Sequence, residues 1–152
     1  MSSRLFLEIR EKRGLAYSIH SSTDHFLDTG ALVIEAGVDP KNLATAVKAI
    51  LEELNRLKEE IPASELSKAK ELCKGRLLLR MEDTRSVAGW QGIQELLLRK
   101  ILSVDEVISI IDSIKADDLL RVAQKLLVNE GLNFAVVGPV KDKPDLEGLL
   151  QL

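Results

Sequence analysis

An arginine and a tyrosine near the start of the chain are its best candidates for a functional site. Arg10 and Tyr17 lie seven residues apart, on either side of Gly14. The arginine side chain is always charged and presents a rigid fork of hydrogen-bond donors, and the tyrosine hydroxyl is a further donor. Two plainer interpretations stay open: Arg10 as a cation at a helix end, and Tyr17 as a core residue.

A capped helix that runs into a strand is expected to position this pair. Ser2 and Ser3 are good N-cap residues, and apolar residues at helical spacing follow them. Gly14 supplies the left-handed conformation that closes many helices. Alternating apolar and polar residues over 15–20 then predict a half-buried strand. Packing of the two elements would hold the arginine and the tyrosine in place.

The rest of the chain predicts further helices and two more strands. A loop over 21–28 leads to a strand over 30–36, which pairs antiparallel with the first. The remaining expected elements are helices over 40–57, 63–81, 84–100, 103–113 and 117–127, and a buried strand over 132–137. Asp39 and Pro40 are expected to open the first of these helices as the N-cap and the first helical residue. Ser103 and Glu106 are expected to form a capping box at the start of the helix over 103–113. This order predicts an α+β fold, an antiparallel sheet with several helices packed on one face.

No other motif amounts to a catalytic or metal site. The only histidines, His20 and His25, lie five residues apart, and neither zinc-protease motif, H-E-x-x-H or H-x-x-E-H, is present. There is no glycine-rich phosphate loop and no nucleophile elbow. Serine, histidine and aspartate side chains cluster over 18–28, but nothing beyond this closeness in sequence supports a catalytic triad. We therefore expect no metal ligands and no self-sufficient catalytic set in this chain.

Composition limits the class of protein. With 152 residues the chain is long enough for a core of its own and is expected to form one domain over 1–152. A net charge of −3 and 3% aromatic residues argue against nucleic-acid binding. No apolar run reaches the ~18 residues of a membrane span, and no signal peptide is evident, so we expect a cytoplasmic protein. The single cysteine, Cys73, is expected to be buried and inert.

Several stretches together resemble one peptidase family. Ser2-Ser-Arg-Leu-Phe, followed by Ile9-Arg-Glu-Lys-Arg-Gly-Leu-Ala-Tyr-Ser, is similar to the second-half signature of pitrilysin/insulinase zinc metallopeptidases. The likeness is nearest to bacterial zinc proteases of the mitochondrial-processing-peptidase type. It continues through 30–40, 65–79, 103–120 and 134–139, and so covers nearly the whole chain.

The resemblance implies a division of labour between two homologous halves that close around an extended peptide. The first half carries H-x-x-E-H and a distal glutamate, which bind zinc and activate water. The second half, to which this chain is similar, contributes an arginine and a tyrosine. By resemblance, Tyr17 would donate to the scissile carbonyl oxygen as negative charge develops there, and Arg10 would hold a nearby substrate carbonyl. Zinc is then expected in the partner half, on the same or a separate chain, and no cofactor in this one.

Two further expectations follow from the resemblance. The family has a helix and a strand ahead of Ser2, so their absence here would uncover a sheet edge and favour self-association. The alternative to a peptidase half is a non-catalytic, structural or partner-binding subunit of the same family, such as a core or regulatory processing-peptidase-like subunit.

Overall fold

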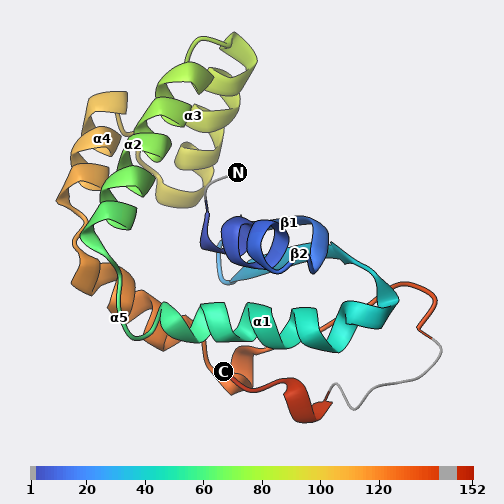
Figure 1. The fold of residues 1–152 in the computed structure, drawn as a ribbon. Helices are drawn as coiled ribbons and strands as arrows, with labels where there is room; N and C mark the ends of the chain where they lie inside the picture. The colour runs from blue at the N-terminus through green and yellow to red at the C-terminus, as the bar shows by residue number, and fades with distance from the viewer. Residues whose placement is uncertain (1–2, 141–146) are drawn as a thin grey trace. The chain divides into compact units, whose positions relative to one another are not determined.

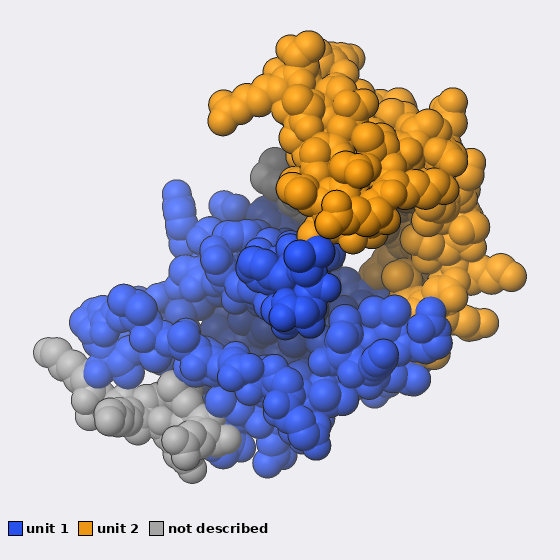
Figure 2. Space-filling model, turned by 180° about the vertical axis from the view of Figure 1, so that it is seen from behind, with its two compact units in different colours: residues 1–60, 121–152 blue, residues 61–120 orange. Residues whose placement is uncertain are grey.

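A computed structural model describes residues 3–140 and 147–152 (Figure 1). The chain falls into two compact units, coloured separately in Figure 2. One unit comprises residues 1–60 and 121–152, and the other comprises residues 61–120. Both contain helices, and the first also contains the antiparallel sheet. The α+β class expected from the sequence is confirmed, whereas the single domain over 1–152 stays a prediction.

The first helix, η1 (Phe6–Lys12), is a π-helix, a wider form than the α-helix expected there. The hydroxyl of Ser3 accepts from the amide of Phe6 at 3.3 Å, as a cap should. Beyond the helix, Gly14 adopts a φ of 61°, and the amide of Leu15 donates back to the carbonyl of Ile9 at 2.9 Å. The predicted helix end at Gly14 is confirmed. Ser2 lies outside the described residues.

Replacing Gly14 by alanine should destabilise the fold through backbone strain alone. A Cβ placed there would meet nothing within 4 Å, but the positive φ disfavours any residue with a side chain. We expect a loss of about 1 kcal/mol in the free energy of unfolding, measured by thermal denaturation. Gly75 of helix α2 (Ala63–Arg80) is the matched control, because it has the same free space without a positive φ. Gly75→Ala should therefore stabilise the chain. Equal effects of the two variants would contradict this reasoning.

The sheet is a single antiparallel hairpin of β1 (Ala16–His25) and β2 (Gly30–Val38). The strands are longer than expected, so the loop predicted over 21–28 was wrong for residues 21–25 and confirmed for residues 26–28. Residues 21–25 pair with residues 30–34 in register, and the amide of Phe26 donates to the carbonyl of Thr29 at 3.0 Å to close a tight turn. Cross-strand hydrogen bonds to β2 thus outweigh the polar composition that suggested a loop.

Helix η1 and helix α1 (Leu43–Arg56) pack with the hairpin in Figure 1. Asp39 and Pro40 open this region as expected, through the short helix η2 (Pro40–Asn42), and the Asp39 carboxylate accepts from the amide of Lys41. One buried cluster joins the three elements: Ile9, Ala16, Ile19 and Ala49. A second buried cluster joins α1 to the residue that follows α5 (Ala116–Leu126): Leu43, Val47, Leu51, Leu54 and Leu127. The expectation of helices on one face of a sheet is therefore confirmed.

The segment after α5 (Ala116–Leu126) departs from the expectation. The short helix η3 (Asn129–Gly131) leads into residues 132–140, which form no strand, although a buried strand was predicted over 132–137. The side chains of Phe134, Val136 and Val137 are exposed. A strand forms only where another strand offers its edge, and among the described residues the sheet contains β1 and β2 alone. Apolar content by itself could not supply that partner. A short helix, η4 (Glu147–Leu149), follows near the end of the chain.

The unit of residues 61–120 consists of helices α2 (Ala63–Arg80), α3 (Thr84–Leu98) and α4 (Val104–Ser113), and the start of α5. Lys74 on α2 reaches the Asp112 carboxylate of α4 at 2.9 Å. The predicted capping box at the start of α4 is confirmed: the amide of Ser103 donates to the Glu106 carboxylate, and the amide of Glu106 donates to the Ser103 hydroxyl. The prediction for Cys73 was wrong, because its side chain is exposed. No neighbour covers that side of α2 among the described residues, so its apolar spacing did not produce burial.

Candidate functional site

Tyr17 points outward because of an irregularity in β1. Ala16 lies opposite Val38 and Ser18 lies opposite Gly37, so one extra residue is inserted in β1 between the two pairs. Such a bulge shifts the alternation of side chains. Ala16 and Ile19, three residues apart, are therefore the buried positions, and Tyr17 is 86% exposed. The interpretation of Tyr17 as a core residue was wrong.

The Arg10 guanidinium lies near two aromatic rings. Its guanidinium carbon is 4.9 Å from the centre of the Phe6 ring and 5.9 Å from the centre of the Tyr17 ring. Both distances are within the ~6 Å range of a cation–π interaction. The structure thus brings the two predicted site residues together, one from η1 and the other from β1. Arg10 also lies in the last turn of η1, so its interpretation as a cation at a helix end stays open.

The other cations at the end of η1 pair with carboxylates. Lys12 forms an ion pair with Glu8, and the hydrogen bond from Lys12 lowers the pKa of the Glu8 carboxyl. Arg13 donates a hydrogen bond of 3.0 Å to the Glu52 carboxylate on α1. Arg10 instead meets a carboxylate only at longer range, with 3.7 Å between its Nε and the exposed Glu11. A weak exposed pair of this kind leaves the guanidinium available to a ligand.

The two histidines do not build a metal site. His20 pairs across the strands with the Glu35 carboxylate at 3.1 Å, and His25 lies 3.1 Å from the Thr23 hydroxyl. In the described part of the chain, no group of three or more His, Cys, Asp or Glu side chains is placed to hold a metal ion. Zinc therefore does not fit the residues described here.

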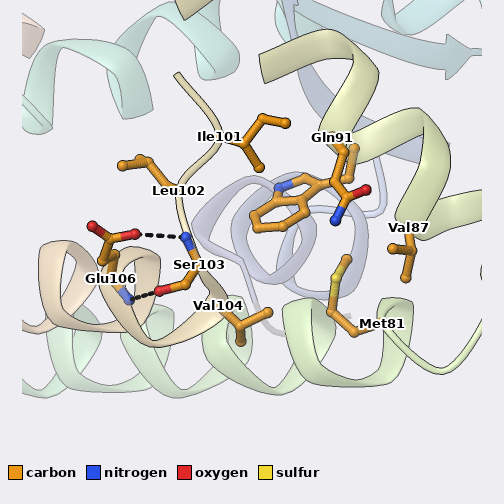
Figure 3. A pocket seen from close by; sticks show the side chains of 9 residues that line it. Met81, Val87, Gln91, Ile101, Leu102, Ser103, Val104 and Glu106 are labelled. Carbon is orange, nitrogen blue, oxygen red and sulfur yellow. Dashed lines mark hydrogen bonds between the residues drawn. The ribbon is translucent and has the colours of Figure 1, made fainter. Parts of the chain in front are cut away.

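A separate concave region occurs in the unit of residues 61–120 (Figure 3). It has a volume of about 470 Å³, and its walls are mainly apolar. Its two most reactive polar groups, Ser103 and Glu106, are hydrogen bonded to one another's backbone in the capping box. The lining residues are Met81, Val87, Trp90, Gln91, Ile101, Leu102, Ser103, Val104 and Glu106. Because both polar groups serve the helix start, this cavity offers no catalytic pair.

Comparison with known proteins points to one peptidase family. Residues 1–73 match the family described as the peptidase M16 inactive domain. A protein named as an uncharacterized zinc protease of Streptomyces coelicolor is 38% identical over 94% of this chain and 31% of its own length. The zinc protease YmxG of Bacillus subtilis is 36% identical over 95% of this chain and 35% of its own length. By these matches the chain is similar to the inactive, C-terminal half-domain of the pitrilysin, or M16, peptidases.

Solved structures agree with this assignment. A chain from complex III2 of Candida albicans, solved with Inz-5 bound, gives a TM-score of 0.74 at 25% identity, over 82% of this chain and 30% of its own. A protease from Helicobacter pylori gives a TM-score of 0.64 at 27% identity, and the match covers 82% of this chain and 30% of the protease chain. The chain described here resembles the non-catalytic half of M16 peptidases, and it spans about a third of the length of the curated relatives it matches.

Sequence reasoning found Arg10 and Tyr17 but missed the features that orient them. Two signals were present. Phe6 precedes Arg10 by four residues, a spacing that brings side chains together on a helix. Gly37 lies inside β2, where an isolated glycine often marks a bulge or a close approach, and a Cβ there would lie 3.1 Å from the Ser18 hydroxyl.

Among the described residues, no helix is both long enough and apolar enough to cross a membrane.

Proposed function

We propose that this chain is the substrate-binding half of an M16 zinc metalloendopeptidase. The zinc and its ligands would belong to a homologous half, on the same or a separate polypeptide, where the metal would polarise the scissile carbonyl and activate water. In this chain, the Tyr17 hydroxyl would donate to the scissile carbonyl oxygen. Arg10 would donate to a neighbouring carbonyl of the substrate backbone. We also propose a cytoplasmic location, in keeping with the sequence.

The observation that carries the proposal is the cation–π contact between Arg10 and Tyr17. The guanidinium and the phenol belong to different elements, yet the guanidinium carbon lies 5.9 Å from the ring centre. The phenol is mostly exposed, so its hydroxyl can meet a substrate. Donors held in place before the reaction stabilise charge as it develops in the transition state, because they need no reorganisation. This arrangement supports a role in peptide hydrolysis.

The hairpin supports the same proposal, since it leaves strand edges available. Among the described residues, β1 and β2 pair only with each other. An extended peptide can add to such an edge through its backbone, which gives binding with little dependence on sequence. The edge would hold the peptide, while Arg10 and Tyr17 would contact carbonyls along it. Self-association through the same edge also stays a prediction.

A reconstitution experiment tests the proposal. We expect the purified chain to show no zinc-dependent hydrolysis of a quenched fluorescent peptide, because no described cluster could hold the metal. Addition of the homologous zinc-bearing half should produce hydrolysis that a chelator abolishes. The zinc-bearing half with its H-x-x-E-H glutamate replaced by glutamine is the control. Hydrolysis by the metal-analysed chain alone, or its absence from the combined halves, would contradict the proposal.

A second candidate is a non-catalytic subunit, and the likeness to a chain of the Candida albicans complex supports it. In that case the homologous half would carry degenerate zinc ligands, and Arg10 and Tyr17 would have no substrate. The sequence of that half distinguishes the candidates directly. An intact H-x-x-E-H favours the peptidase, and its loss favours the structural subunit.

A further inference from the structure

Phe6 provides one side of the surroundings of Arg10. It lies at the start of η1, four residues before the arginine, and its ring centre is 4.9 Å from the guanidinium carbon. The Tyr17 ring, at 5.9 Å, comes from β1. The cation is thus in contact with rings from two elements, and the Phe6 ring is the nearer.

Core packing does not account for the position of Phe6. The fully buried residue of η1 is Ile9, and the described, partly buried side chains around its cluster include Leu5 and Leu15 but not Phe6. Phe6 itself is only half-buried. Its large ring therefore contributes more to the arginine than to the apolar cluster beside it.

The remaining contact of Arg10 is too weak to orient the guanidinium. Glu11 lies 3.7 Å from Nε, and both side chains are substantially exposed, at 39% for Arg10 and 54% for Glu11. Ion pairs of this kind contribute little, because water screens them and both side chains lose freedom. A flat guanidinium against a ring face has fewer orientations open to it. The ring contact is thus the more directional of the two.

We propose that Phe6 is a positioning residue, which holds Arg10 against Tyr17 so that the guanidinium donors face the substrate. This inference rests on the proposed function of Arg10 in binding a substrate carbonyl. Phe6 itself contacts no substrate and acts through the arginine. Its contribution should appear in substrate binding, because a carbonyl held equally in ground and transition states affects KM more than kcat.

Kinetics in two backgrounds test this role. In the chain combined with its zinc-bearing half, Phe6→Leu should raise KM about 2- to 5-fold, the range that corresponds to an exposed cation–π contact. In an Arg10→Ala background the same change should have no further effect on KM. Phe6→Tyr keeps an aromatic ring, so its KM should equal that of the wild-type chain. Phe26→Leu is the matched control, because it removes an exposed ring from the hairpin turn. An equal rise in both backgrounds would show a purely structural role and overturn the proposal.

A second readout needs no substrate. The δ-methylene protons of Arg10 should resonate upfield of their random-coil values in the wild-type chain, because of the ring currents of Phe6 and Tyr17. Phe6→Leu should move them back toward those values, and Phe26→Leu should not. Unchanged Arg10 resonances in Phe6→Leu would overturn the proposal. If Arg10→Ala leaves hydrolysis intact, the proposed function fails, and these resonances still decide whether Phe6 positions the arginine.

Discussion

Replacing Tyr17 by phenylalanine is expected to lower kcat of the combined peptidase halves about 100-fold, with little change in KM. Removal of one donor from an oxyanion site costs between about 100- and 1,000-fold in other hydrolases. The loss should appear in kcat because the hydrogen bond strengthens only as charge develops on the carbonyl oxygen. Steady-state hydrolysis of a quenched fluorescent peptide measures both constants.

This substitution isolates the hydroxyl well. Phenylalanine keeps the ring beside Arg10, and Tyr17 is mostly exposed, so the stability of the chain should not change. Ser22→Ala is the matched control, since it removes a hydroxyl from an exposed position farther along β1. Unchanged kcat in Tyr17→Phe, or an equal loss in Ser22→Ala, would remove Tyr17 from the reaction.

Replacing Ile9 by alanine should have the largest effect on stability. Ile9 is fully buried, and its cluster joins η1 to β1 and α1 through Ala16, Ile19 and Ala49. Truncation of such a residue removes apolar contacts and leaves a cavity, at a cost of about 2–5 kcal/mol. Urea denaturation followed by circular dichroism should show a transition at lower urea than in the wild-type chain.

The neighbouring Leu7 provides the control for this variant. It lies on the same helix but is 39% exposed, so Leu7→Ala should change the free energy of unfolding much less. Because Ile9 holds η1 to the sheet, its loss should also weaken peptide hydrolysis through a displaced Arg10. Equal destabilisation by both variants would mean that helix propensity, rather than burial, dominates at η1.

Local patterns predicted the helices and their ends well. The Ser3 cap, the left-handed Gly14, the Asp39-Pro40 start and the Ser103–Glu106 capping box all appear as expected. Each depends on hydrogen bonds between residues only a few positions apart, or on the φ preference of one residue. Such features need no knowledge of the rest of the fold.

Predictions that required a distant partner were less successful. The stretch over 132–137 is apolar enough for a buried strand, yet it forms none, because a strand needs a neighbouring edge. The polar stretch over 21–25 forms part of a strand, because β2 is in register beside it. Cys73 has apolar neighbours in sequence, but its side of α2 is exposed. In each case the deciding contact lies far away in the sequence.

The candidate site shows the same division. The sequence by itself determined that Arg10 and Tyr17 flank a helix end closed by Gly14, which made them the candidate residues. Only the tertiary structure decided that Tyr17 is exposed and that its ring meets the arginine. That outcome depends on the bulge opposite Val38 and Gly37, residues some twenty positions away along the chain. Strand alternation alone would have turned the tyrosine inward, whereas pairing with β2 turned it toward Arg10.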